Sequence, residues 1–222
     1  EIVLTGIETG SYGTDFDTPY DLADLIAELD MRGSCDRLRL GSLAPELIGK
    51  KFVDKVKNTK ILAPHFHLSM QSGSDSVLRG MKRRYNRTMA LENINYIREN
   101  FDTAQFTTDL MVGFPGESED DFLDTVDFVR QARFIDAHVF AYSRRHGTPA
   151  ADYPGQIDEA VKKQRSRELI DVKNQVRDEI LSCIVADGRP LSVILEVYKN
   201  GLYSAHSDGF IEVRVSAPLC MQ

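Results

Sequence analysis

Thr108-Asp-Leu-Met-Val-Gly-Phe-Pro-Gly-Glu117 is the stretch that decides the fold. Its apolar run, Leu110-Met-Val112, stops at Gly113, and the turn formers Pro115 and Gly116 follow at once. Acidic residues then open a segment whose apolar side chains recur at helical spacing, at Phe122, Val126 and Val129. The pattern predicts a buried strand, a tight turn and a helix that packs back on the sheet.

In a parallel α/β protein this turn lies at the carboxyl end of the strand, which is where ligands bind. Glycines in the turn let the backbone approach a ligand closely. Ser118 and Asp121 have the spacing of a capping box for the helix. An ordinary strand-to-helix turn has the same local chemistry, so the neighbouring segments have to decide between the two interpretations.

The rest of the chain repeats the alternation of strand and helix. Further strands are predicted at 2–7, 37–43, 65–70 and 136–143, and a long helix at about 158–184. A helix is predicted to start at Thr18-Pro19, with Thr18 as its cap. Five strands alternating with helices predict an α/β fold with parallel pairing and right-handed crossovers. All five strand-end loops then fall on one face of a barrel or open sheet.

The tail has a different character. Leu191, Val193, Leu195 and Val197 alternate with polar residues, Asn200-Gly201 is a strong hairpin signal, and alternation resumes over 210–215. We therefore divide the chain into an α/β domain, 1–185, and the start of a small antiparallel β domain, 186–222.

Composition is that of a soluble globular protein of 222 residues, with 42% hydrophobic and 27% charged residues. No apolar run is long enough to span a membrane, so we expect no membrane partner. The three cysteines make neither a disulfide framework nor a metal-binding spacing, and a cytoplasmic location fits them best. The net charge of −7 is uneven: basic clusters at 82–87, 144–145 and 162–167 could contact RNA or be solvated helix faces.

Several stretches together resemble one family, the radical S-adenosylmethionine (SAM) methylthiotransferases that modify tRNA. The matching segments are Glu1-Ile-Val-Leu-Thr-Gly-Ile7, Ser11-Tyr-Gly13, Leu40-Gly-Ser-Leu43, Pro45-Glu46, His67-Leu-Ser-Met-Gln-Ser-Gly-Ser-Asp75, Val77-Leu78, Met81-Lys-Arg-Arg-Tyr85, Asp109–Glu117 and Gly147-Thr-Pro-Ala-Ala151. The tail, from Gly201 to Val215, is similar to the start of a TRAM domain, a small RNA-binding β-barrel. The loop Thr5–Gly13 most resembles the branch that acts on threonylcarbamoyladenosine.

The resemblance implies a TIM-like partial barrel of six parallel strands, of which this chain would supply five, followed by the TRAM-like domain. It also implies S-adenosylmethionine and [4Fe–4S] clusters as cofactors, the tRNA anticodon loop as substrate, and a reductant protein as partner. The family holds its radical cluster in a Cys-x3-Cys-x2-Cys loop, which this chain lacks. We therefore expect a fragment without a preceding domain and cluster loop, which holds no metal, has no catalytic residue of its own and does not turn over.

Site residues follow from the resemblance by position. Gly6 and Glu8 would meet the methionyl amino group of the cofactor. Its ribose and carboxylate would meet Ser42, Gln71 and Ser72, and its adenine would face an apolar wall with free backbone groups, formed by Val112, Gly113, Phe114 and Pro115. The candidates for tRNA contacts are Arg83, Tyr85, Tyr142 and Arg144. Each also has an ordinary explanation, such as solvation for Glu8 and the arginines, or core packing for Tyr142 and Phe114.

Other functions stay open. Isopentenyladenosine tRNA or an aspartate of a ribosomal protein could be the methylthiolation substrate instead of N6-threonylcarbamoyladenosine. The chain could be a non-catalytic RNA-binding module. His65 and His67 point to the same face of a strand and could hold a hydrolase metal together with His138 and Asp109. His65 lies at the start of its strand, far from the functional end, which speaks against that metal site.

Overall fold

The computed structural model describes residues 1–6 and 9–216. A parallel sheet dominates it, with β1 paired to β2 and with the order β3-β4-β5-β6. β2 and β3 are two pieces of one extended segment, interrupted only at Gly41. The strands are β1 (Ile2–Leu4), β2 (Leu38–Leu40), β3 (Ser42–Leu43), β4 (His65–Gln71), β5 (Gln105–Val112) and β6 (Asp136–Ala141). This confirms the predicted α/β fold with five parallel strand positions.

The interruption at Gly41 has a steric cause. The Gly41 amide donates to the carbonyl of Leu4 at 2.7 Å, which draws β1 against the second strand position. A Cβ on Gly41 would come within 3.0 Å of that carbonyl oxygen. Glycine therefore permits this close approach, as expected where two backbones meet.

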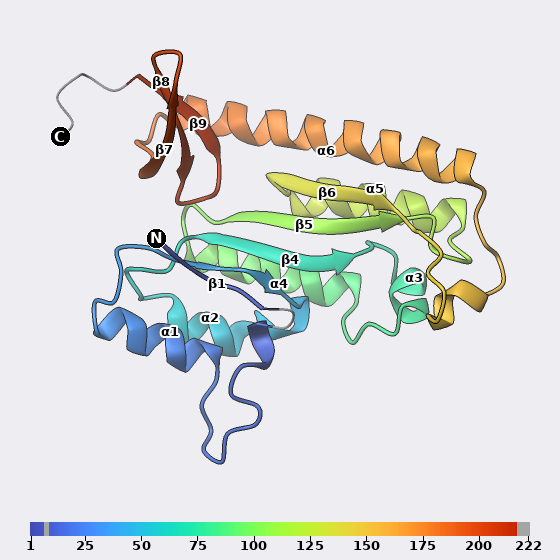
Figure 1. Cartoon of the computed structure of the whole chain (residues 1–222), viewed down its shortest axis with the longest axis horizontal. Helices are drawn as coiled ribbons and strands as arrows, with labels where there is room; N and C mark the ends of the chain where they lie inside the picture. Colours follow the sequence, from blue (N-terminus) through green and yellow to red (C-terminus); the bar gives the residue numbers. More distant parts are fainter. Residues whose placement is uncertain (7–8, 217–222) are drawn as a thin grey trace.

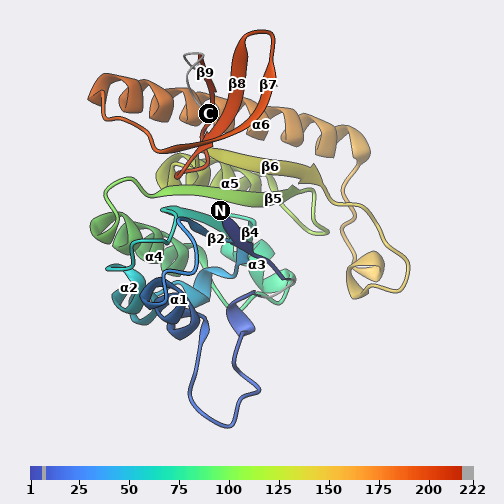
Figure 2. The same cartoon turned by 60° about the vertical axis from the view of Figure 1, so that its left-hand side comes forward.

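Helices cover one face of the sheet (Figure 1). Those on that face are α1 (Leu22–Met31), α2 (Lys50–Val56), α4 (Arg87–Asn100) and α5 (Glu119–Ala132). The short α3 (Asp75–Gly80) lies at the carboxyl edge of the sheet, and the long α6 (Glu159–Asp187) runs beside β6 and α5 (Figures 1 and 2). Three 3-10 turns complete this part, η1 (Thr9–Ser11), η2 (Pro45–Leu47) and η3 (Pro149–Asp152).

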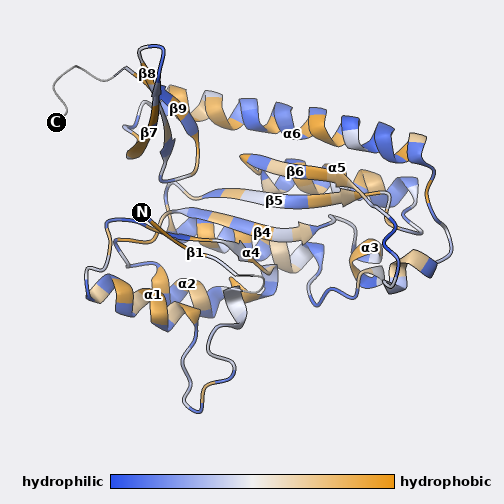
Figure 3. Ribbon diagram, in the orientation of Figure 1, coloured by the Kyte–Doolittle hydropathy of each residue, from blue (hydrophilic) through white to orange (hydrophobic). Residues whose placement is uncertain are grey.

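The core lies between the sheet and these helices. Alternate residues of the strands face it, so that hydrophobic and polar positions alternate along the ribbons (Figure 3). Its largest fully buried side chains include five phenylalanines, Phe66, Phe106, Phe122, Phe128 and Phe134. Each such burial contributes roughly 1.5–3 kcal/mol. The opposite face of the sheet carries polar side chains, among them His67, Thr107 and Asp109.

Two helix starts test the capping predictions. α5 begins after Ser118, and the predicted capping box with Asp121 is present. The prediction for α1 is wrong, because the helix begins at Leu22 and its cap is Asp21, not Thr18. Asp21 forms a reciprocal capping box with Asp24, which satisfies two backbone amides that Thr18 could not reach.

The C-terminal strands form a separate antiparallel sheet, as predicted. β7 (Val193–Lys199), β8 (Leu202–Ser207) and β9 (Glu212–Val215) pair in sequence order. Asn200 and Gly201 both have positive φ, 54° and 82°, as a type I′ hairpin turn requires. Arg39 of β2 fixes this sheet to the larger one, because its guanidinium donates to the carbonyls of Ser207 at 3.2 Å and Asp208 at 3.0 Å.

Candidate functional site

The carboxyl ends of all the parallel strands meet at one edge of the sheet, beside α3 and η3 (Figure 1). The loops after β1, β3, β4, β5 and β6 form this edge. It is the edge at which an α/β protein of this kind binds ligands. We call it the carboxyl edge.

The loop Gly113–Glu117 after β5 is built by its own last residue. The buried carboxylate of Glu117 accepts the amide of Gly113 at 2.6 Å and closes the loop. Arg165 of α6 donates to the same carboxylate oxygen at 2.8 Å. Gly113 has φ +73°, and a Cβ there would collide with the side chain of Lys162. The motif is therefore a tightly specified turn clamped by α6.

This geometry changes the expected role of the loop. The amide of Gly113 is used by Glu117, so it is not a free group for adenine, contrary to the prediction. Val112 is fully buried in the main core. Phe114 and Pro115 are also buried, and the Phe114 ring packs 5.7 Å from that of Tyr142. In this structure these apolar side chains pack against the protein itself.

The residues after β4 divide into two kinds. Ser72 is completely buried, bonds Thr125 and accepts the amide of Ser74, so its hydroxyl is engaged in holding the loop. Gln71 has φ +65°, a costly conformation for a residue with a Cβ, at a register shift of the strand. Among the described residues its side-chain amide has no hydrogen-bond partner. Gln71 is thus held in a strained conformation with its polar group unused.

The remaining cofactor candidates lie on β1 and β3. Ser42 is half-buried, and its hydroxyl has no hydrogen bond to the described residues. Gly6 is open, since a Cβ there would meet only Thr9, at 3.8 Å. Glu8 lies outside the described residues. Gly6, Ser42 and Gln71 therefore keep groups available at the carboxyl edge, whereas Ser72 does not.

Four polar residues form a hydrogen-bonded row on the open face of the sheet. Thr107 Oγ1 lies 2.9 Å from His65 Nε2 and 3.0 Å from His67 Nδ1, and His67 Nε2 lies 3.3 Å from Asp109 Oδ2. The hydrogen bond from His67 lowers the pKa of Asp109, although burial opposes the shift. Burial lowers the pKa of His65 to about 3, so its imidazole is neutral.

This row does not support the hydrolase hypothesis. The described residues contain no cluster of three or more His, Cys, Asp or Glu side chains that could hold a metal ion. His65 instead stacks on Phe210, with ring centroids 4.8 Å apart. Its position at the start of β4 is the one expected from the sequence.

The four residues expected to contact tRNA fall into two groups, exposed arginines and buried tyrosines. Arg83 and Arg144 are exposed, as a phosphate contact needs. Tyr85 is buried and donates to the carbonyls of Ser69 and Met70, at 2.6 and 3.0 Å. Tyr142 is buried against Phe114. Neither ring is on the surface, so both tyrosines support the loops and do not present a face to RNA in this conformation.

A small apolar cluster holds the two basic loops in place. Val77, Phe114 and Tyr142 form its centre, and Met81 packs against it. Met81 immediately precedes the exposed cations 82–84, and Tyr142 precedes the exposed cations 144–145 by two residues. We call these five cations the basic rim; they are Lys82, Arg83, Arg84, Arg144 and Arg145.

Two residues that hold this site, Lys162 and Arg165, were not predicted from the sequence. Their cluster, 162–167, suggested a charged surface, yet both side chains are buried. Their spacing of three residues puts them on one face of α6. Glu117 could have indicated them from the sequence. Its carboxylate needs a buried cation once the turn that carries it is packed under a helix.

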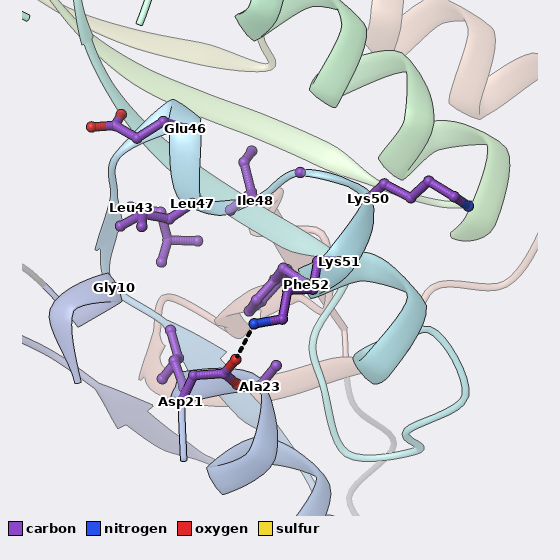
Figure 4. A pocket seen from close by; sticks show the side chains of 12 residues that line it. Gly10, Asp21, Ala23, Leu43, Glu46, Leu47, Ile48, Lys50, Lys51 and Phe52 are labelled. Atoms are coloured by element: carbon purple, nitrogen blue, oxygen red, sulfur yellow. Dashed lines mark ion pairs between the residues drawn. The ribbon is translucent and has the colours of Figure 1, made fainter. Parts of the chain in front are cut away.

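A cavity of about 400 Å³ lies elsewhere, between α1 and α2 (Figure 4). Leu22, Leu47 and Phe52 line it, and Lys51 and Asp21 form an ion pair across it at 3.5 Å. It lies on the helical side of the sheet, and none of the expected site residues lines it. We therefore do not place the functional site in this cavity.

Residues 4–129 match the family described as the Radical SAM superfamily. The chain is 39% identical over 180 residues to a tRNA-2-methylthio-N(6)-dimethylallyladenosine synthase of Alkaliphilus oremlandii (strain OhILAs), covering 81% of this chain and 38% of that protein. It is 35% identical over 217 residues to the threonylcarbamoyladenosine tRNA methylthiotransferase MtaB of Bacillus subtilis (strain 168), covering 96% of this chain and 48% of the relative.

A second tRNA-2-methylthio-N(6)-dimethylallyladenosine synthase, from Pelotomaculum thermopropionicum, is 40% identical over 176 residues, which cover 79% of this chain and 39% of that protein. The chain thus spans less than half the length of these curated relatives. Among the described residues, no helix is long and apolar enough to cross a membrane.

Proposed function

Because the chain belongs to the radical SAM superfamily and is similar to proteins named as tRNA methylthiotransferases, we propose that its full-length protein methylthiolates tRNA. The substrate we propose is N6-threonylcarbamoyladenosine beside the anticodon, modified at C2. Two kinds of relative match this chain, one named for threonylcarbamoyladenosine and one for dimethylallyladenosine. The choice between them rests on the chemistry of the carboxyl edge.

The basic rim is the observation that carries this choice. Its five cations are exposed. Within residues 1–6 and 9–216, only Arg144 of the five has an ion-pair partner, the highly exposed Asp152, at 3.6 Å. The threonyl group carries a carboxylate, whereas the dimethylallyl group is apolar. Arginine binds carboxylates and phosphates with charge-assisted hydrogen bonds. A cationic rim beside the ligand edge therefore favours the threonylcarbamoyl nucleoside.

The residues present also fit a SAM cofactor at the carboxyl edge. Gln71, Ser42 and Thr9 bring amide or hydroxyl groups to this edge that no described residue satisfies. Such groups suit the ribose and the amino-acid part of the cofactor. When bound, SAM together with an iron–sulfur cluster supplies the radical chemistry and the methyl group. The chain's own residues would bind and orient the cofactor and shield it from water.

The same proposal includes an RNA-binding role for the C-terminal sheet and a reductant protein as partner. Residues 186–222 would begin an RNA-binding β domain, docked on the larger sheet through Arg39. A reductant protein would deliver the electrons that the cluster needs. Dimethylallyl (isopentenyl) adenosine tRNA is the second candidate substrate, favoured by the higher identity of those relatives.

The test uses the full-length protein with reconstituted clusters. It is incubated with SAM, a reductant and tRNA that carries either threonylcarbamoyl- or isopentenyladenosine, and the digested nucleosides are analysed by mass spectrometry. We expect the methylthio product only from the threonylcarbamoyl tRNA. Product from the isopentenyl tRNA alone would replace the proposed substrate, and product from neither would contradict the proposed function.

A further inference from the structure

Glu46 carries a carboxylate that has no hydrogen-bond or ion-pair partner among the described residues. It lies on the η2 turn, directly after β3. Its Oε2 atom is buried and has no hydrogen bond, and no cation of the described residues forms an ion pair with it. A buried acceptor left without a donor costs free energy, so each such atom in a folded protein calls for an explanation.

Neighbouring side chains hold the turn that carries Glu46. Asn93 of α4 donates to the carbonyl of Pro45 at 2.9 Å, and Leu47 wedges against Gly10, where any Cβ would collide with it. Glu46 lies on the wall of the cavity between α1 and α2, and its carboxylate points away from Lys51 (Figure 4). The nearby lysine does not neutralise it.

A second unpartnered oxygen lies on the adjoining turn. Thr9 Oγ1, on η1, is also buried and has no hydrogen bond to any residue that the structure describes. η1 and η2 touch where Gly10 meets Leu47, the residues that directly follow Thr9 and Glu46 in the chain. Two acceptors thus come from adjacent turns after β1 and β3.

Glu46 also lies within electrostatic reach of Tyr85, whose hydroxyl is bonded at the end of β4. Its charge is among the causes that raise the pKa of Tyr85 to about 12, after burial as the main cause. The Tyr85 hydroxyl is bonded to the carbonyls of Ser69 and Met70, directly before the strained Gln71. The carboxylate therefore lies within electrostatic reach of the edge where Gln71 has its unused amide.

We propose that Glu46 binds the vicinal hydroxyl groups of a ribose, with Thr9 as a second contact, in a nucleoside ligand at the carboxyl edge. A carboxylate accepts both hydroxyls of a ribose, which is the way acidic side chains recognise this sugar in dinucleotide sites. One buried and one more open oxygen match two donors. The inference rests on the proposed function only in naming the ligand, the ribose of SAM.

The test measures binding, not turnover, in the full-length protein. S-adenosylhomocysteine and 5′-methylthioadenosine, which both carry the ribose diol, are titrated calorimetrically into the unmodified protein and into Glu46→Gln and Thr9→Val. Glu92→Gln, an exposed acid on α4, is the matched control. Thermal denaturation of each variant checks that the fold is kept.

Glu46→Gln is expected to weaken both ligands about tenfold or more, because hydrogen bonds to a charged group are lost. Thr9→Val is expected to weaken both by about threefold to tenfold, as for one neutral hydrogen bond. The 2′-deoxy analogue of methylthioadenosine should bind weakly and lose little further affinity in Glu46→Gln.

Three results would overturn the inference. The first is that Glu46→Gln and the control variant bind both ligands with equal affinity. The second is a loss of affinity for S-adenosylhomocysteine alone, which would assign the carboxylate to the amino group of the ligand. The third is that neither ligand binds the unmodified protein. A Glu46-dependent affinity in a protein that yields no methylthio product would refute the proposed function and leave this inference standing.

Discussion

Replacing Arg165 by Met should damage the fold through the loop that opens the functional edge. The guanidinium donates to the carboxylate of Glu117 at 2.8 Å and to its backbone carbonyl at 3.1 Å. It also pairs with Glu119 at 3.0 Å. The Glu117 side chain is 0% exposed and that of Arg165 8%. Methionine keeps much of the volume but leaves the buried carboxylate without its cation.

The expected cost follows from that burial. Removing one partner of a buried ion pair typically costs about 3–5 kcal/mol. The contact with Glu119 adds little, because that carboxylate is 68% exposed. For a protein of this size, each kcal/mol lowers the Tm by roughly 2–4 °C, so the variant should melt roughly 6–20 °C lower.

The cost should depend on pH in a defined direction. Burial raises the pKa of Glu117 even with Arg165 in place. An acid whose pKa is higher in the folded state favours folding at low pH and loses that contribution as the pH rises through the folded pKa. Without Arg165 that pKa rises further. The defect of the variant should therefore be smaller at pH 5 than at pH 8.

Urea denaturation of the full-length protein at both pH values measures this, with Arg167→Met as the matched control. Arg167 lies on the same helix, is exposed and has no ion-pair partner among the described residues. The control should lose less than about 0.5 kcal/mol. Glu117→Gln combined with Arg165→Met should be more stable than Arg165→Met alone. A loss below about 1 kcal/mol, or a defect that grows at low pH, would refute the ion-pair account.

Three further outcomes are expected. Gly113→Ala should destabilise the protein by at least about 1 kcal/mol in urea denaturation, because φ at Gly113 is +73° and the new Cβ would collide with Lys162. An unchanged midpoint of urea denaturation would contradict this turn geometry. Arg83→Ala and Arg144→Ala should each weaken tRNA binding and reduce the slope of log K against log salt by up to about one, and an unchanged slope would remove that arginine from the RNA contact. Elemental analysis should give the same zinc content for the unmodified protein and for His65→Ala with His67→Ala, whereas zinc lost on substitution would revive the metal site.

Much of the fold could be predicted because local signals and tertiary structure agree. The hydrophobic patterns of β4 and β5 end in loops that contain glycine, and both segments are strands. Asn200-Gly201 requires positive φ at both residues and therefore specifies its hairpin without help from the rest of the chain. Ser118 and Asp121 cap α5 within four residues of sequence. In each case the decisive interaction is short in sequence.

The failures depend on contacts far apart in the chain. The sequence predicts a free amide at Gly113, yet Glu117 accepts this amide, and Arg165, 48 residues later, holds Glu117 in turn. Nothing local shows that Lys162 and Arg165 face inward. The unpartnered oxygen of Glu46 was equally invisible, because an absent partner can be recognised only when all neighbours are placed.

Nucleoside analysis of tRNA from cells tests the central claim most directly. The gene for the full-length protein would be deleted, then restored in its original form or with Arg83→Ala and Arg144→Ala together. We predict that 2-methylthio-N6-threonylcarbamoyladenosine disappears on deletion, returns with the original gene, and returns only in part with the arginine variant. An unchanged level of this nucleoside after deletion, with loss of the methylthio-isopentenyl nucleoside instead, would contradict the account.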